Sequence, residues 1–166
     1  AYLAELTDRV LPDGEPGTGL FPLLKGAYEA LSAGKDAAIV CSIAEFGLFG
    51  YAGVAPVTDR CAECGRAPEE EAAFWSPEGG GLLCGGCRGR TADAMPLAPA
   101  VRALLPRLQR LEPHRLGDVR VRSATRAGIR AALARWSDRH LDLKLRSKAV
   151  LEQLEAVLGG GNEPSE

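Results

Sequence analysis

The sequence predicts a mainly α protein, a helical bundle with a small inserted four-cysteine ribbon. Apolar residues recur at helical spacing in both halves of the chain, and a stretch rich in Gly, Pro, Cys and Glu without a helical period separates them. The 166 residues include five cysteines, four of them in two Cys-x-x-Cys pairs within that stretch. We expect a bundle from residues 1–52 and 97–158, a metal-binding module at 53–92 and a flexible tail at 159–166.

Three helices with short connections are expected in the first fifty residues. The first ends at a loop that begins with Pro12, the second runs from Thr18 as its N-cap to Gly34, and the third starts near Asp36. Their apolar residues are Leu3, Leu6, Val10 and Leu11 in the first helix, Leu20, Phe21, Leu24, Tyr28 and Leu31 on one face of the second, and Ile39, Val40, Ile43, Phe46 and Phe49 in the third.

The third helix belongs to a nearly continuous apolar stretch, Ala37 to Val57, which raises the question of a membrane span. Glu45 lies at its middle, where a carboxylate costs about 2.5–3.5 kcal/mol in a bilayer. Three glycines also interrupt it. A buried core helix is the prediction, and no membrane contact is expected.

The second half begins with the ribbon and returns to helices. Two short strands, residues 73–75 and 82–84, are expected on either side of a glycine turn. A helix from about Pro99 to Leu111 breaks near Pro113, and a long helical run follows from about Arg120 to Leu158. An apolar stripe of Ile129, Leu133, Trp136 and His140 runs along that last helix.

The charge of the chain is unevenly distributed. The net charge is −2, yet residues 101–150 hold 13 Lys and Arg and 4 Asp and Glu, a local net charge of +9. Such a basic block in an acidic protein predicts a local anionic partner, either a phosphate backbone or an acidic peptide. The alternative is that these cations only solubilise helix surfaces or pair with the acidic N-terminal helices.

The four paired cysteines predict a structural zinc site. Cys61-x-x-Cys64 and Cys84-x-x-Cys87 are separated by 19 residues, the spacing of four-cysteine zinc sites, and glycines lie in or beside both turns. Four thiolates close the metal shell, which indicates a structural rather than a catalytic ion. Two disulfides or an iron–sulfur or redox site are the alternatives.

No catalytic site and no cofactor-binding site is expected. The sequence has two histidines, His114 and His140, and neither lies near a plausible nucleophile. His140 falls on the apolar stripe of its helix, which favours a partly buried structural histidine. Cys41 lies apart from the pairs in the apolar third helix and is expected to be a buried core thiol. The protein is therefore predicted not to be an enzyme.

Several ordered motifs together carry a resemblance to a known family. They are Ala1 to Leu6, Leu20-Phe21-x-x-Leu24, Gly53-x-x-Pro56 followed by Cys61-x-x-Cys64-Gly65, Phe74, Gly79-Gly80-Gly81-x-Leu83-Cys84-x-x-Cys87 and His140-Leu141-x-x-Lys144-Leu145-Arg146-Ser147. In this order they resemble the RecO family of DNA repair and recombination mediators, over residues 1 to about 155.

The resemblance implies both a fold and a function. Family members have an N-terminal OB domain, a helical bundle and a zinc module, and the OB domain is expected to be missing before Ala1. They bind single- and double-stranded DNA, anneal strands, and load RecA together with RecR and the acidic C-terminal tail of single-stranded-DNA-binding protein. A cytoplasmic, nucleoid-associated bacterial protein is expected. A zinc-stabilised interaction scaffold without its own DNA binding is the alternative.

The basic residues of the last helical run are the candidates for binding DNA or the acidic tail. The bundle offers apolar stripes beside cations, as such a tail requires, whereas the ribbon places three arginines beside Glu69, Glu70 and Glu71. The candidate residues are Arg126, Arg130, Arg135, Arg139, Lys144, Arg146 and Lys148.

Overall fold

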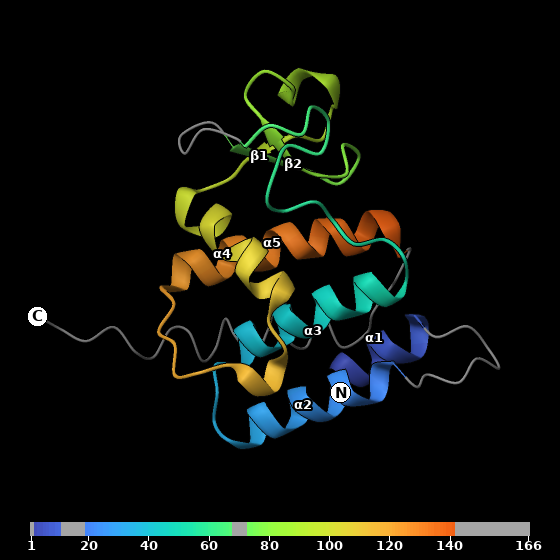
Figure 1. Cartoon of the computed structure of the whole chain (residues 1–166), viewed down its shortest axis with the longest axis vertical. Coiled ribbons are helices and arrows are strands. Elements are labelled where there is room, and N and C mark those ends of the chain that lie inside the picture. The colour runs from blue at the N-terminus through green and yellow to red at the C-terminus, as the bar shows by residue number, and fades with distance from the viewer. Residues whose placement is uncertain (1, 11–18, 68–72, 142–166) are drawn as a thin grey trace, which may run out of the picture.

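The computed structural model describes residues 2–10, 19–67 and 73–141, and within them the chain is mainly helical with a small sheet at one end (Figure 1). The predicted fold class is confirmed. The elements, in order, are α1 (Tyr2–Val10), α2 (Leu20–Ser32), α3 (Ala37–Tyr51), β1 (Ala73–Ser76), β2 (Gly81–Cys84), the short 3-10 helix η1 (Arg88–Arg90), β3 (Met95–Pro96), α4 (Pro99–Arg110), the 3-10 helix η2 (Pro113–Arg115) and α5 (Ser123–His140).

The boundary between α2 and α3 lies where the sequence predicts it. Gly34 has a φ of +75°, and the backbone N–H of Lys35 donates to the Ala30 carbonyl at 3.1 Å, which ends α2. One carboxylate oxygen of Asp36 accepts from the N–H groups of Ala38 and Ile39 and caps α3. Leu11, the loop from Pro12 and Thr18 lie outside the described residues; the N-cap of α2 is Gly19 and not the predicted Thr18.

The apolar face predicted for α2 is only partly buried. Phe21 and Tyr28 are 69% and 44% exposed, whereas Ala27 and Ala30 are buried. Helices α2 and α3 pack closely, since a β-carbon on Gly47 of α3 would come within 2.6 Å of the Leu23 side chain. The inward face of α2 thus combines Leu20 with Ala27 and Ala30, while Phe21 and Tyr28 face outward.

Helix α3 lies at the centre of the bundle and contacts α1, α2, α4 and α5. It is a buried core helix, as predicted. Its acidic residue Glu45 is 9% exposed and accepts a hydrogen bond from the Tyr2 hydroxyl of α1. Burial, together with the charge of Glu45, raises the pKa of Tyr2, so the phenol remains a donor. No helix in the described part of the chain is long and apolar enough to cross a membrane.

The sheet has the order β2-β1-β3, and both pairs are antiparallel. The two predicted strands are present, and β3 is an additional strand whose two residues, Met95 and Pro96, carry no strand pattern. Alternate residues of β1 and β2 point to opposite faces. Trp75 and Leu82 belong to the main core with the helices, while Leu83 packs with the cysteines. The ribbon and the bundle therefore share one hydrophobic core.

Glycine is required at position 81, at the start of β2, because the backbone there passes close to the backbone of Val57. The φ of Gly81 is +128°, and a β-carbon there would lie 2.3 Å from the Val57 carbonyl oxygen. We expect Gly81→Ala to destabilise the protein by several kcal/mol through backbone displacement and strain. Gly86→Ala is the matched control, because nothing lies within 4 Å of that position and its φ is not positive. Equal denaturation midpoints for the two variants would contradict this prediction.

The two C-terminal helices of the described chain begin close to the predicted positions. Pro99 starts α4, and α5 begins at Ser123. Helix α5 ends at His140 with Leu141 as its C-cap, whereas the predicted run continues to Leu158; residues 142–158 and the predicted tail at 159–166 lie outside the described residues. The division into domains at 52, 92 and 97 remains a prediction.

Candidate metal centre and its contacts with the helical bundle

Two tight turns place the four paired cysteines at one end of the sheet. Cys61 and Cys64 precede β1, and the N–H of Gly65 donates to the Cys61 carbonyl at 2.8 Å. Gly65 has a φ of +74°, a value that favours glycine and lets this turn close. Cys84 ends β2, and the N–H of Cys87 returns to its carbonyl at 3.0 Å. Each Cys-x-x-Cys segment thus folds back on itself and directs two sulfur atoms to one point.

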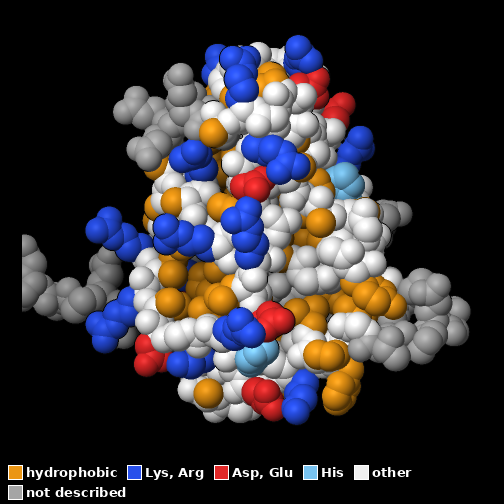
Figure 2. All heavy atoms as spheres, viewed as in Figure 1, with side chains coloured by type: hydrophobic (Ala, Val, Ile, Leu, Met, Phe, Trp, Pro, Cys, Tyr) orange, Lys and Arg blue, Asp and Glu red, His pale blue; other side chains and the backbone are white. Residues whose placement is uncertain are grey.

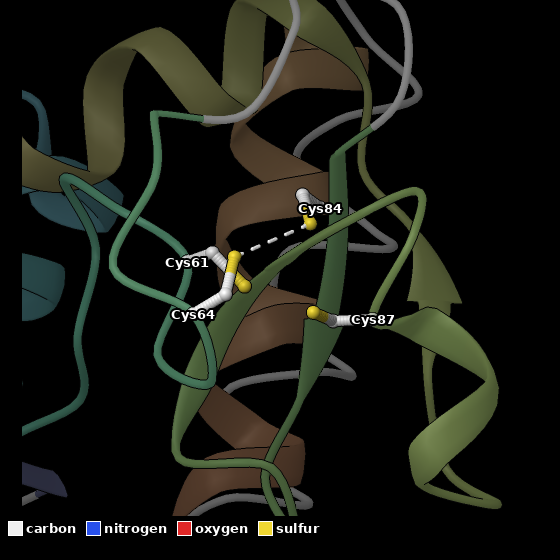
Figure 3. A group of neighbouring side chains, drawn as sticks. All are labelled: Cys61, Cys64, Cys84 and Cys87. Carbon is white, nitrogen blue, oxygen red and sulfur yellow. Dashed lines mark hydrogen bonds between the residues drawn. The ribbon is translucent and has the colours of Figure 1, made fainter.

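The four sulfur atoms form one compact cluster (Figure 3). All of them lie within 4.8 Å of one another, and the Cys64 and Cys84 sulfurs are 3.8 Å apart. A tetrahedral zinc with Zn–S bonds of about 2.3 Å separates its sulfurs by about 3.8 Å. A disulfide requires about 2.05 Å, and all four cysteines are free thiols. The arrangement fits a four-thiolate metal ion and contradicts two preformed disulfides.

The cluster is buried on one side only. Cys61 and Cys87 are buried, Cys84 is partly buried and Cys64 is exposed. Leu83 packs against the two buried cysteines, and Phe74 lies at the edge of this small group. A metal held here would be shielded from solvent on the sheet side and approachable from the side of Cys64.

The environment favours ionisation of the exposed thiol. The backbone N–H and then the guanidinium of Arg66 lower the pKa of Cys64 to about 6. Burial, followed by the neighbouring thiols, raises the pKa of Cys87 to about 12. A divalent cation replaces the protons of such a cluster and offsets the electrostatic repulsion between neighbouring thiolates. With four sulfur ligands it would have no open position for water, which is the property of a structural site.

The remaining cysteine and the two histidines do not join this cluster. Cys41 is partly buried against the main core, and burial together with Glu45 raises its pKa to about 12, so it stays a thiol. His140 stacks on Trp136 with ring centroids 4.1 Å apart and is partly buried, as predicted. His114 is exposed on η2 beside Glu112.

Trp75 connects the metal-binding module to the bundle. It is completely buried, packs on Trp136 of α5 with centroids 5.6 Å apart, and donates its indole N–H to the Ala132 carbonyl at 2.9 Å. Because Trp75 lies on β1, paired directly with the cysteine-bearing β2, the sheet transmits the position of the cysteines to α5. Sheet and helix therefore depend on each other for a common core.

Four helix side chains complete this connection by donating hydrogen bonds to backbone carbonyls of residues 54–93, which we call the carbonyl contacts. Two acceptors precede Cys61, one lies in the turn between β1 and β2, and one precedes β3, so the segment is held at four separate points. The four contacts are Trp136 to Val54 at 2.8 Å, Gln109 to Pro56 at 2.8 Å, His140 to Pro77 at 3.0 Å and Arg135 to Asp93 at 3.0 Å.

The structure separates the predicted cationic residues into different surroundings. Arg126 pairs with Asp36, the cap of α3, at 3.0 Å and so joins α5 to α3. Arg135 is exposed and contacts the module, and Arg130 and Arg139 are exposed on α5. Lys144, Arg146 and Lys148 lie outside the described residues. Figure 2 shows Lys and Arg outnumbering acidic side chains over the part of this face where α4, α5 and the module lie.

The main feature that sequence reasoning missed is the contact between module and bundle. Trp136 and His140 were on the predicted stripe, and Trp75 was in a predicted strand, but nothing local indicated that they meet. The two tryptophans are the only ones in the chain, a scarcity that could have drawn attention to them. Arg66, whose backbone and side chain contact the Cys64 thiol, is likewise visible only in the structure.

Comparisons with known proteins place the chain in a family. The family model described as the C-terminal part of recombination protein O matches residues 1–149. The chain is 32% identical over 166 residues to a DNA repair protein RecO of Bacillus pumilus, 34% over 154 residues to that of Exiguobacterium sibiricum, and 31% over 159 residues to that of Anaeromyxobacter dehalogenans.

These alignments cover 98%, 92% and 96% of the chain but only 64%, 61% and 63% of the three relatives. The chain thus spans somewhat less than two thirds of their length. The ordered motifs, the mainly helical fold, the cysteine cluster and the match to residues 1–149 agree with one another. The chain belongs to the RecO family, within the C-terminal region of that family.

Proposed function

We propose that this protein acts in DNA repair and homologous recombination as a non-enzymatic mediator, which binds single- and double-stranded DNA and assists strand annealing and RecA loading with RecR and single-stranded-DNA-binding protein. The observation that carries the proposal is the family match over residues 1–149. Such a role would place it in the bacterial cytoplasm, at the nucleoid.

The cysteine cluster would hold one structural Zn²⁺ in this function. Cys61, Cys64, Cys84 and Cys87 supply four sulfur ligands, which Zn²⁺ accepts in a tetrahedral arrangement. When bound, the ion would fix the two turns and keep β1 and β2 in register. The side chains of the bundle, rather than the ion, would then meet DNA and protein partners.

We propose that DNA binds to the basic surface of α5. Arg130 and Arg139 are exposed there, and Arg126 is partly exposed. These cations lie on the two flanks of the buried stripe of α5 and reach solvent, which suits binding to a phosphate backbone without sequence preference. The continuation of this surface through Lys144, Arg146 and Lys148 is also proposed.

The test is the salt dependence of binding to a labelled single strand, measured by fluorescence anisotropy. The double variant Arg126→Gln with Arg130→Gln removes two phosphate contacts. It should weaken binding and make the slope of the logarithm of the association constant against log salt less negative by about 1.4. The control, Lys25→Gln with Arg115→Gln, removes the same charge from exposed ion pairs on α2 and η2. Circular dichroism checks folding, because Arg126 also pairs with Asp36.

Two outcomes would argue against this surface. Equal losses in the two double variants would show a response to net charge alone. No binding by the wild type at low salt would favour the zinc-stabilised scaffold without its own DNA binding.

The acidic C-terminal tail of single-stranded-DNA-binding protein is proposed to dock on the helical bundle rather than on the ribbon. A peptide with that tail should then compete with DNA in the same titration, since both would use the cations of α5. Arg135 is less suited to a test by substitution, because it also contacts the Asp93 carbonyl.

A further inference from the structure

We propose that the cysteine cluster is a peroxide-sensitive switch in which oxidation joins Cys64 to Cys84, expels the metal and loosens the module from α5. The inference rests on the proposed zinc site. Three observations support it. The ligand Cys64 is exposed, and its sulfur lies 3.8 Å from that of Cys84. The sheet that includes Cys84 also packs against α5 through Trp75.

Access to the four sulfurs is unequal. Cys64 is the exposed member of the cluster, while Cys61 and Cys87 are buried behind it against Leu83. An oxidant arriving from solvent therefore meets Cys64 first. Its sulfur lies 3.8 Å from that of Cys84, so closing this contact to a disulfide of about 2.05 Å needs a movement of less than about 2 Å.

The chemistry requires one molecule of hydrogen peroxide per disulfide. The Cys64 thiolate attacks one peroxide oxygen, the O–O bond breaks, and a sulfenic acid forms with release of hydroxide. The Cys84 thiolate then attacks the Cys64 sulfur, the S–O bond breaks, and a second hydroxide leaves. Two sulfurs are oxidised by one electron each and the peroxide is reduced by two. Both hydroxides take up protons from the buffer and become water.

Loss of two ligands would release the ion. Cys61 and Cys87 alone offer two thiolates, and a two-ligand site holds Zn²⁺ far more weakly than a four-ligand site. The two turns would then no longer share an ion, and the Cys64–Cys84 disulfide would join them at a single point. Unlike the metal, the new disulfide leaves the buried pair unconnected.

The consequence reaches α5 through the sheet. Cys84 pairs with Ala73 of β1, two residues from Trp75, whose indole lies between β1 and the Ala132 carbonyl. Trp75 and Trp136 are the two tryptophans of the chain, and each donates an indole hydrogen bond across the module–bundle contact. Tryptophan emission is thus a direct measure of docking.

The experiment treats the full chain with hydrogen peroxide and records three quantities: zinc released to a chromogenic chelator, disulfides mapped by mass spectrometry after alkylation, and tryptophan emission. We expect about one zinc released per chain, a Cys64–Cys84 disulfide, and a red shift of the emission, all reversed by dithiothreitol with added zinc. Disulfides confined to Cys61–Cys64 and Cys84–Cys87, or a Cys64–Cys84 bond with metal and emission unchanged, overturn the proposal.

Two variants sharpen the result. Cys64→His preserves a four-ligand set of three cysteines and one histidine, which also binds Zn²⁺, but it cannot form the disulfide. It should retain zinc and release it at least several-fold more slowly under peroxide; release at the wild-type rate overturns the proposal. Cys41→Ser removes the cysteine outside the cluster and should respond as the wild type does.

Failure of the zinc site itself would be visible separately. Metal analysis before oxidation reports the stoichiometry, and a value near zero contradicts the proposed cofactor. The disulfide map of the same sample still decides whether Cys64 and Cys84 are the pair that peroxide joins.

Discussion

Replacing Cys61 with Ser is expected to lower the thermal midpoint by about 10 °C or more, since each kcal/mol corresponds to roughly 2–4 °C in a domain of this size and loss of a structural metal costs several kcal/mol. Cys61 is fully buried, so the remaining three thiolates lose a ligand that solvent cannot readily replace. Differential scanning calorimetry together with metal analysis measures the effect.

A chelator and a second cysteine provide the controls for Cys61→Ser. A strong chelator should lower the midpoint of the wild type toward that of the variant and leave the variant itself nearly unchanged. Cys41→Ser should retain the metal, because Cys41 lies in α3 outside the cluster. An unchanged midpoint in metal-free wild type would contradict a stabilising role for the ion.

Trp75→Ala is expected to destabilise the protein by about 3–5 kcal/mol, the usual cost of deleting a fully buried large aromatic side chain. The indole is 0% exposed and packs on Trp136, so its removal leaves a cavity where the sheet meets α5. Chemical denaturation measures the free energy of unfolding. Because the cysteines are untouched, the folded variant should still bind one metal ion.

Two substitutions bracket the Trp75 result. Trp75→Phe retains most of the apolar volume and loses the hydrogen bond to the Ala132 carbonyl, so its cost should be intermediate. Phe21→Ala removes an aromatic that is 69% exposed and should change the free energy by no more than about 0.5 kcal/mol. A loss in Phe21→Ala as large as in Trp75→Ala would place a contact on α2 that the described residues do not show.

The sequence was most informative where local chemistry decides the structure. The spacing of the four cysteines predicted their cluster, because Cys-x-x-Cys turns converge whatever surrounds them. Asp36 and Gly34 marked helix ends, because capping involves only neighbouring residues. Glu45 in the apolar stretch correctly indicated a core helix, and the structure supplies its partner, Tyr2.

The remainder depends on contacts between distant residues. Periodicity placed Phe21 and Tyr28 on an apolar face but could not show that α2 would instead bury Ala27 and Ala30. The contact from Trp75 to Ala132 spans 57 residues, and no local pattern encodes such a partner. The pairing of Arg126 with Asp36 across 90 residues is of the same kind.

The carbonyl contacts have a consequence for how mutations accumulate across the module–bundle boundary. Their acceptors are main-chain oxygens, which every residue type supplies, whereas their donors are particular side chains on α4 and α5. A substitution at Val54 leaves the acceptor in place as long as the backbone path is kept, while a change at Gln109 or Trp136 removes the donor. For these contacts, substitutions should therefore accumulate more readily at an acceptor such as Val54 than at the donors on the helices. Asp93 is an exception, because its carboxylate also accepts hydrogen bonds from the Ser76 hydroxyl and the Glu78 N–H.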